Sequence, residues 1–211
     1  VFPPYANEAM LMVAEGVKPA LIENAAIAMG MPIGPLAVVD ETTLQLGYDI
    51  LTSTKEELGD AYVPSGTEEL MDIMVKQIDR RGRRFGGGFY EYAEDGSKKL
   101  WPGLADHFPL AEQQPDVEEV KQRLMFIQLI ATAQCFDEGV VSDPQSADLG
   151  AIFGWGFAPW TGGPMSHIDT MGVDNFVRIA DNLAQKYGER FKPPMSFRKK
   201  ADAGESFYKA A

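Results

Sequence analysis

Histidine and cysteine, two side chains well suited to catalysis, are scarce in this chain of 211 residues. It contains two histidines, His107 and His167, and one cysteine, Cys135. Histidine is the side chain best suited to moving protons near neutral pH. His107 lies in a proline-rich stretch and is expected at the surface. His167 lies on a predicted helix, where capping or packing is expected and a general base is the alternative. Spacing assembles no catalytic triad or metal-ligand set, so we expect no catalytic and no metal-binding residue.

A glycine run and a group of cations are further candidates for ligand binding. The glycines at 86–88 follow no buried strand and precede no long helix, which argues against a dinucleotide- or phosphate-binding loop. A tight turn that packs Phe89 and Tyr90 onto helices is the favoured interpretation. The cations could contact phosphates, pair with another domain, or form a solvated helix end. They are Lys76, Arg80, Arg81, Arg83 and Arg84.

Two apolar loops, residues 30–35 and 154–164, are stiffened by glycine and proline and contain Met, Phe and Trp side chains. Loops of this kind can wall a pocket for an acyl or aromatic ligand. They can equally form interface surface. Composition alone leaves both interpretations open.

The overall composition excludes several classes of protein. Nineteen basic residues against 31 acidic ones give a net charge of −12, which argues against a nucleic-acid-binding surface. No apolar run approaches the roughly 20 residues of a membrane span, and no signal-peptide pattern opens the chain. A single cysteine excludes an internal disulfide framework and a cysteine-based zinc site. We therefore expect a soluble cytoplasmic protein.

Helical periodicity dominates the chain. Apolar residues recur at spacings of three and four along 117–136 and 176–187, and also along the shorter stretch 67–77. Residues 5–15 are also expected to be helical. The alternation typical of strands is clearest at 89–92, where it is short. The predicted fold class is all-α.

The two halves of the chain resemble each other. Corresponding residues keep the same order at offsets of 123 to 129, as expected for a duplicated unit with short insertions. In each half a helix ends at a glycine, a second helix runs from a proline to a glycine, and a Gly-Pro step begins a third. The pairs are Gly16 and Gly139, Pro19 and Pro144, Gly30 and Gly154, Gly34-Pro35 and Gly163-Pro164, and Asp40 and Asp169.

This repeat predicts three parts of the chain. Residues 1–95 form a first helical domain, 96–115 a connector punctuated by proline and glycine, and 116–211 a second helical domain. Two such domains that pack through equivalent faces would form a pseudo-dimer within one chain.

Ordered motifs along essentially the whole chain resemble the C-terminal domain of the 3-hydroxyacyl-CoA dehydrogenases. The second half is similar to the second copy of that domain in the multifunctional β-oxidation proteins. In the first half the resemblance rests on Pro4-Tyr5-Ala6-Asn7-Glu8-Ala9, Glu15-Gly16, Gly30-Met31-Pro32-Ile33-Gly34-Pro35, Asp40, Gly82-Arg83-Arg84 and Gly86-Gly87-Gly88-Phe89-Tyr90. In the second half it rests on Asp137-Glu138-Gly139-Val140, Gly154-Trp155-Gly156-Phe157-Ala158-Pro159, Gly162-Gly163-Pro164, Asp169, Arg190-Phe191-Lys192-Pro193-Pro194 and Gly204-Glu205-Ser206-Phe207-Tyr208.

The resemblance implies the C-terminal part of an enzyme that oxidises L-3-hydroxyacyl-CoA with NAD. In that family an upstream Rossmann domain holds NAD and a catalytic histidine–glutamate pair, and multifunctional members also carry an enoyl-CoA hydratase domain. This chain opens at Val1 without a methionine, and we expect it to be a fragment that is inactive alone. Its implied partners are the upstream NAD domain, acyl-CoA, and a thiolase subunit or a second copy.

Substrate contact is the role that the resemblance assigns to the first loop. The residues expected to face the acyl thioester are Met31, Pro32, Gly34 and Pro35, and no cofactor contact is expected in this chain. A departure from the family pattern lies just before Phe89, where residues 84–88 are bulkier and richer in glycine than usual. This departure weakens a ligand role for Arg83 and Arg84. The alternative function is a stand-alone helical module for oligomerisation or acyl-CoA binding, without catalysis.

Overall fold

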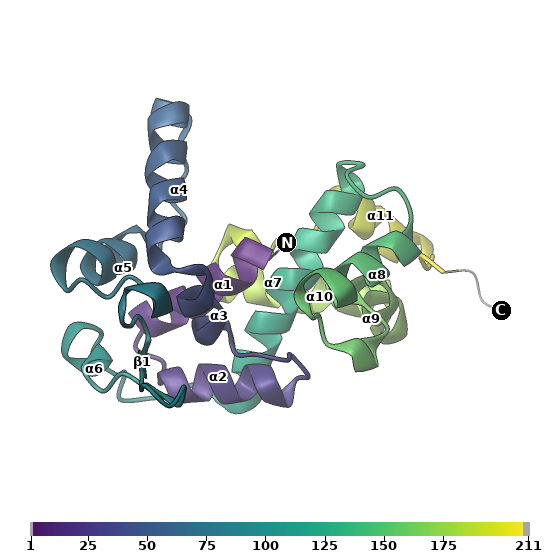
Figure 1. The fold of residues 1–211 in the computed structure, drawn as a ribbon. Helices are drawn as coiled ribbons and strands as arrows, with labels where there is room; N and C mark the ends of the chain where they lie inside the picture. The colour runs from purple at the N-terminus through teal and green to yellow at the C-terminus, as the bar shows by residue number, and fades with distance from the viewer. Residues whose placement is uncertain (1, 209–211) are drawn as a thin grey trace. The chain divides into compact units, whose positions relative to one another are not determined.

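Helices make up most of residues 2–208, which are the part of the chain that this computed structural model describes (Figure 1). The chain divides into two compact units that exchange short segments. The N-terminal unit consists of residues 6–26 and 33–117, and the C-terminal unit of residues 2–5, 27–32 and 118–208. Segment 96–115, expected as a connector, belongs to the N-terminal unit, and the predicted boundaries of the sequence domains stay a prediction.

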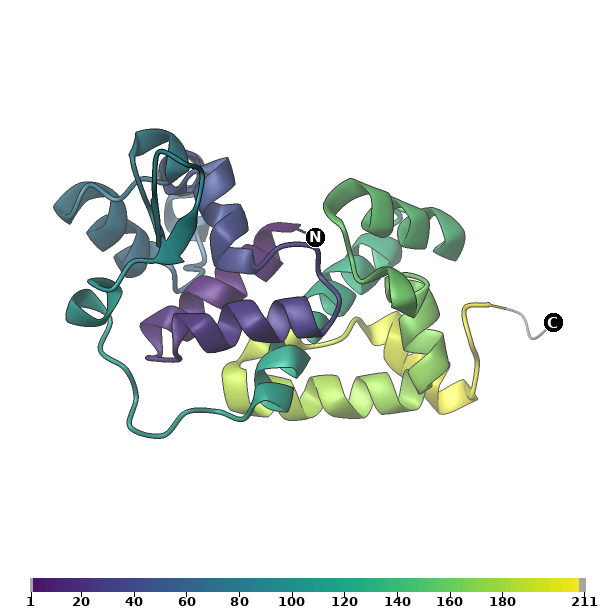
Figure 2. The same cartoon turned by 60° about the horizontal axis from the view of Figure 1, so that its bottom comes forward.

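The N-terminal unit contains most of the first two helices and all elements that follow them up to residue 117. These elements are α1 (Phe2–Ala14), α2 (Pro19–Ala28), α3 (Pro35–Thr42), α4 (Leu44–Leu58), η1 (Gly59–Ala61), α5 (Glu68–Asp72), η2 (Ile73–Gln77), η3 (Arg83–Phe85), β1 (Tyr90–Tyr92), β2 (Lys98–Leu100) and α6 (Leu104–His107). In Figure 1, α4 projects from the rest of this unit, and only its first residue is buried. Figure 2 shows the hairpin and, after α6, an extended segment.

The hairpin formed by β1 and β2 is the part of the structure that departs from the predicted all-α fold class. β1 pairs antiparallel with β2, with Tyr90 opposite Leu100 and Tyr92 opposite Lys98. The first strand was expected near residues 89–92, whereas the second strand and α6 lie in the segment expected to be an irregular connector. Three-residue strands carry too little alternation to be found without their partner.

The C-terminal unit is built around the long helix α7 (Val117–Asp137), whose residues 123–133 are buried. The other elements are α8 (Pro144–Trp155), η4 (Pro159–Thr161), α9 (Pro164–Met171), α10 (Val173–Tyr187), η5 (Glu189–Phe191) and α11 (Met195–Ala203). Aromatic rings fill its core: Phe126 stacks on Phe176 with centroids 5.7 Å apart, and Phe197 contacts both Phe176 and Phe207. Such rings bury much apolar area and stabilise the packing of α10 and α11 on α7.

Most predicted helix ends are confirmed, and one is wrong. Gly16 and Gly139 take positive φ angles where α1 and α7 end, and Pro35 and Pro164 begin α3 and α9. The prediction that the helix from Pro144 ends at Gly154 is wrong, because α8 continues to Trp155 and Gly156 is the left-handed residue after it. Trp155 donates its Nε1–H to Gln128 Oε1 at 3.1 Å, which supports this last turn of α8.

Candidate functional site

The loop between α2 and α3 is fixed at its far end by a buried carboxylate. Glu23, on α2, accepts a hydrogen bond at Oε1 from the backbone N–H of Leu36, at 2.7 Å, in the first turn of α3. A Cβ atom at Gly34 would lie 2.2 Å from Glu23 Oε2, so only glycine allows this approach. The negative charge also suits the positive end of the α3 dipole. Glu23 therefore sets where the loop enters α3.

A second carboxylate, Asp40 near the end of α3, holds the segment that leads into the hairpin. Its oxygens accept the backbone N–H groups of Phe89 and Tyr90, each at 2.8 Å, and the hydroxyl of Tyr92 at 3.0 Å. The Tyr90 hydroxyl donates to Glu23 Oε2 at 2.5 Å and so links the two acids. We call this group (Glu23, Asp40, Phe89, Tyr90 and Tyr92) the first carboxylate cluster.

Burial shifts the protonation equilibria of the first carboxylate cluster. Loss of hydration raises the pKa of Glu23 and that of Asp40, and their hydrogen bonds oppose this rise. Burial also raises the pKa of the Tyr90 phenol, and its hydrogen bond to Glu23 adds to the effect. The pKa of Tyr92 is raised in the same way, by burial and by the charge of Asp40. The phenols therefore stay protonated and act as donors to the two acids.

The glycines at 86–88 pack against the first carboxylate cluster, and this use replaces the alternative of a phosphate-binding loop. A Cβ atom at Gly88 would lie 1.9 Å from Asp40 Oδ1, and the N–H groups of Gly87 and Gly88 donate to the carbonyls of Gly82 and Tyr90. With its amides used internally and a carboxylate against it, the run does not fit the pyrophosphate of NAD. The expected tight turn that packs Phe89 and Tyr90 inward is confirmed, since both are buried.

The four predicted substrate-contact residues differ in their exposure. Met31, Gly34 and Pro35 are buried, whereas Pro32 is exposed. Pro32 is thus the one of the four with surface available for a direct contact. Nothing in the structure tests substrate contact by Met31, Pro32, Gly34 and Pro35, and it stays a prediction.

The start of the same loop packs against the loop expected as its counterpart. Within the C-terminal unit, Trp160 donates its Nε1–H to the carbonyl of Met29 at 2.8 Å. A Cβ atom at Gly30 would lie 2.7 Å from the Trp160 ring, and one at Gly156 would lie 2.6 Å from Pro32 Cγ. Both glycines therefore allow residues 29–32 to pack closely against residues 156–160 inside the C-terminal unit.

The C-terminal unit contains a similar pair of acids, which we call the second carboxylate cluster (Asp148, Ser166, Asp169, Phe207 and Tyr208). Asp148, on α8, accepts the backbone N–H of Met165 at 2.6 Å in the first turn of α9, the Ser166 hydroxyl, and the Tyr208 hydroxyl at 2.7 Å. Asp169, on α9, accepts the N–H groups of Phe207 and Tyr208. Burial raises the pKa of the Tyr208 phenol to about 12, and its hydrogen bond to Asp148 contributes.

Sequence reasoning singled out Asp40 and Asp169 as repeat markers but missed the roles of Glu23 and Asp148. Both missed acids lie on largely apolar helices and are buried there. An acidic residue within an apolar helical segment, followed by a Gly-Pro step, was the available signal, because a buried carboxylate needs nearby donors.

The cations near the hairpin are used within the N-terminal unit. Arg80 donates to the carbonyls of Gly88 and Tyr90 at 2.6 and 2.8 Å, and its guanidinium lies 4.0 Å from the centre of the Trp101 ring. Arg83 pairs with Glu41 at 2.6 Å, Arg81 pairs with Asp79, and Lys76 lies over the Tyr48 ring. These contacts give four of the five cations a partner among the described residues, although Lys76, Arg83 and Arg84 are all exposed.

The histidines contact aromatic rings. His107 is exposed and stacks on Trp101, with centroids 5.9 Å apart, and His167 meets Trp160 edge to face at 5.5 Å. Burial lowers the pKa of His167, which favours the neutral ring in a packing role. Among residues 2–208 no group of histidine, cysteine and acidic side chains is arranged to hold a metal ion. No helix in the same range is long and apolar enough to cross a membrane.

Known proteins resemble this chain both in sequence and in fold. Residues 1–92 match the family model described as the 3-hydroxyacyl-CoA dehydrogenase, C-terminal domain. The chain is 34% identical to the fatty acid oxidation complex subunit alpha of Shewanella halifaxensis, over 97% of this chain and 28% of the relative. It is 32% identical to the subunit of the same name from Vibrio cholerae, over 99% of this chain and 29% of the relative. The resemblance seen in the motifs is confirmed.

Two solved structures share the fold of this chain. The first is 3-hydroxybutyryl-CoA dehydrogenase from Escherichia coli, with a TM-score of 0.66 at 19% identity over 95% of this chain and 58% of that chain. The second is the dehydrogenase part of multifunctional enzyme 1 from C. elegans, with a TM-score of 0.62 at 14% identity over 93% of this chain and 45% of that chain. The chain spans less than a third of the length of the curated relatives above.

Proposed function

We propose that this chain is the C-terminal helical region of an NAD-dependent L-3-hydroxyacyl-CoA dehydrogenase of fatty acid β-oxidation. Its role is to close the acyl-CoA cleft and to hold domains or subunits together, while the chemistry takes place upstream. The observation that carries the proposal is the match to fatty acid oxidation subunits along 97% of the chain. The cytoplasm is the proposed location.

The loop before α3 is the proposed wall of the acyl-CoA cleft. Pro32 supplies the exposed surface, while Met31, Gly34 and Pro35 set the path of the backbone. The hydrogen bond from Leu36 N to Glu23 supports this role, because it holds the loop in one conformation before a ligand arrives. A rigid wall positions a thioester without an ordering cost.

We also propose that the two halves are tandem repeats that form a pseudo-dimer. The two carboxylate clusters support this in detail. In each, an acid on one helix accepts an N–H at the start of the next helix and a tyrosine hydroxyl, and a second acid accepts the two N–H groups of a Phe-Tyr pair. The order along the chain is the same in both halves, which fits a duplicated unit.

NAD and the catalytic groups are proposed to lie in a domain outside this chain. NAD would supply hydride transfer there, and a histidine–glutamate pair would take the hydroxyl proton, as the resemblance implies. No residue of this chain is proposed to hold NAD, which agrees with the internal use of the amides at 86–88. A thiolase subunit or a second copy of the protein is the proposed further partner.

The test compares this chain alone with the chain joined to an NAD domain. The isolated chain, mixed with NADH and acetoacetyl-CoA, is expected to leave the NADH absorbance at 340 nm unchanged. A fusion at Val1 to the upstream part of the Shewanella halifaxensis relative is expected to oxidise NADH. Turnover by the isolated chain would refute the proposal, and an inactive, well-folded fusion would favour a stand-alone module for oligomerisation or acyl-CoA binding.

A further inference from the structure

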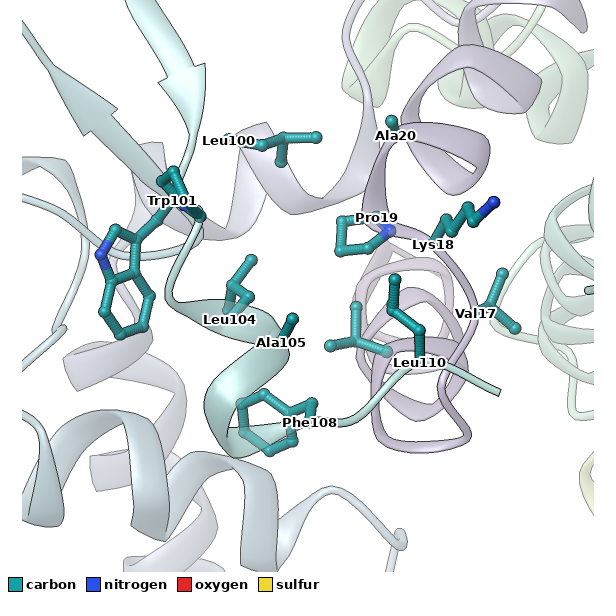
Figure 3. A pocket seen from close by; sticks show the side chains of 12 residues that line it. Val17, Lys18, Pro19, Ala20, Leu100, Trp101, Leu104, Ala105, Phe108 and Leu110 are labelled. Atoms are coloured by element: carbon teal, nitrogen blue, oxygen red, sulfur yellow. The ribbon is translucent and has the colours of Figure 1, made fainter. Parts of the chain in front are cut away.

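A pocket of about 250 Å³ lies in the N-terminal unit between the α1–α2 turn and α6, and none of the residues considered above for substrate contact lines it (Figure 3). Its inner wall is formed by Val13, Val17, Leu104 and Phe108, all buried. Its remaining lining is also apolar except for Lys18 and includes the Trp101 ring. Apolar lining with a single charged residue favours a ligand with a hydrocarbon body and one anionic group.

One wall of the pocket is fixed by hydrogen bonds between the α1–α2 turn and the segment after α6. The Gly16 carbonyl accepts the Ala111 N–H and the Gln114 side-chain amide, both at 2.9 Å. The backbone N–H of Lys18 donates to Gln114 Oε1 at 2.7 Å. Gly16 has a φ of +83°, and a Cβ atom there would lie 2.6 Å from Ala111 N, so the close approach depends on glycine.

The opposite wall is fixed by Trp101. Its backbone N–H donates to the Phe89 carbonyl at 2.8 Å, Arg80 covers its ring, and His107 stacks on it. Since both walls are held by bonds outside the cavity, the pocket is formed before a ligand enters. A preformed apolar pocket avoids the cost of ordering its own side chains during binding.

The size and charge of the pocket identify the class of ligand. A cavity of about 150 Å³ lined by aliphatic and aromatic side chains is enough to bind benzene. At about 250 Å³ this pocket can take more carbon atoms than benzene has, which corresponds to a chain of roughly six to eight carbons. Lys18 is exposed and forms no ion pair within residues 2–208. In Figure 3 its side chain points away from the cavity, so the flexible chain has to turn toward the rim for its ammonium to meet an anion there.

We propose that this pocket binds the alkyl chain of a medium-length aliphatic carboxylate, with Lys18 as the counter-ion of the head group. The inference does not depend on the proposed function, because it rests on the lining, volume and fixed walls of the pocket. A sugar, nucleotide or peptide backbone would bring polar groups that the inner wall leaves without partners.

The first experiment titrates the 211-residue chain with butanoate, hexanoate and octanoate at pH 7 by calorimetry. Affinity is expected to rise about fourfold for each added methylene, the factor that burial of one CH₂ gives. Decanoate is expected to gain less than this factor, because its end extends beyond the pocket. Equal affinities for butanoate and octanoate would overturn the proposal.

Variants then locate the site. Ala20 and Ala105 are exposed alanines that line the pocket, so Ala20→Phe and Ala105→Phe are expected to fill it and lower octanoate affinity at least tenfold. Ala61→Phe, at an exposed alanine away from the pocket, is the matched control and is expected to bind as the parent chain does. Circular dichroism and the melting temperature verify folding. Octanoate binding that both pocket variants retain in full would overturn the proposal.

The head-group contact has its own test. Lys18→Gln is expected to weaken octanoate binding about two- to fivefold, as for a solvent-exposed ion pair, and to leave 1-octanol binding unchanged. A loss of equal size for both ligands would overturn the role of Lys18. If octanoate does not bind but the chain self-associates in sedimentation, and Ala105→Phe abolishes that association, the pocket is an interface between copies and the proposal is wrong.

Discussion

Tyrosine hydroxyls satisfy the buried acids of both carboxylate clusters. A carboxylate that loses its hydration is costly unless each oxygen accepts hydrogen bonds, and removing one donor exposes much of that cost. Glu23 receives one backbone N–H and the Tyr90 hydroxyl, and Asp40 receives two N–H groups and the Tyr92 hydroxyl. The clusters therefore join local backbone structure to tertiary contacts.

Tyr90→Phe should destabilise the chain through Glu23. The substitution keeps the ring but removes the donor to a buried acid, so the free energy of unfolding should fall by about 1–3 kcal/mol. Urea unfolding followed by circular dichroism measures this change.

Tyr48→Phe is the matched control for that experiment. The Tyr48 hydroxyl lies 3.5 Å from Asp72 Oδ1, at the limit of a hydrogen bond, and the contact is partly exposed. Its loss should change the free energy of unfolding by no more than about 0.5 kcal/mol. Similar losses for both variants would show that the Tyr90–Glu23 bond has no special weight.

Glu23→Gln should change how stability depends on pH. Burial raises the pKa of Glu23 in the folded chain above 4.5, so the folded chain binds this proton more tightly than the unfolded chain does. The stability that protonated Glu23 contributes is present below pH 4.5 and is lost as pH rises through its folded pKa. Relative to the parent chain, the Gln variant should therefore gain stability with rising pH. Urea midpoints at several pH values test this, and parallel profiles would contradict it.

The residues of the two clusters could be predicted from the sequence only where the role of a residue depends on its neighbours along the chain. Gly34 and Gly88 were visible in the sequence, but the reason for each is a carboxylate on another element, Glu23 on α2 for Gly34 and Asp40 on α3 for Gly88. The Tyr90 hydroxyl reaches an acid 67 positions away, and no local pattern encodes such a pairing. Gly34, one of the four proposed loop contacts, is buried against the acid on α2, which its local sequence does not reveal.

Among the elements, α8 has two glycines without a packing reason. A Cβ atom at Gly150 or Gly154 would meet nothing within 4 Å, and both residues lie inside the helix. Glycine in a helix costs about 0.5–1 kcal/mol relative to alanine because its backbone loses more freedom on folding. Gly150→Ala and Gly154→Ala should each stabilise the chain by that amount, as measured by urea unfolding.

Gly156→Ala is the contrasting control. Gly156 takes the left-handed conformation after α8, and a Cβ atom there would approach Pro32 Cγ. This substitution should destabilise the chain by at least about 1 kcal/mol. Stabilisation by all three substitutions would mean that α8 ends differently from the structure described above.

Long helices were predictable and short elements were not. α7 and α10 contain the two longest stretches that were predicted to be helical. They could be predicted because a long helix repeats the same apolar spacing over four or more turns. The helix expected at 67–77 occurs as α5 followed by the π-helical turn η2, a change of hydrogen bonding that periodicity does not report. β2 depends on pairing with β1, which is a tertiary contact.

For the whole molecule, the two carboxylate clusters share no residue and lie in different units. Destabilising changes at sites without shared partners add within about 0.5 kcal/mol. Tyr90→Phe and Tyr208→Phe should therefore add in the double variant, which urea unfolding of the four chains measures. A double variant that loses much less or much more than the sum would show that the clusters are coupled.

The order of motifs predicted the family and the helical class, but not the exchange of segments between units. Residues 27–32 come from the first half and pack with the second, through Met29 and Trp160 among others. A tandem repeat read as two consecutive blocks assigns every residue to its own half. The exchange depends on which apolar surfaces meet, and composition left that open for both loops.

The raised pKa values of the cluster phenols have a consequence in alkaline solution. A free tyrosine loses its proton near pH 10, whereas the phenols of Tyr90, Tyr92 and Tyr208 keep theirs to higher pH while the chain is folded. Above pH 10 the unfolded chain therefore releases protons that the folded chain retains, and stability falls as pH rises. Tyrosinate absorbance near 295 nm should rise in two phases, and the second phase should coincide with the loss of helical ellipticity.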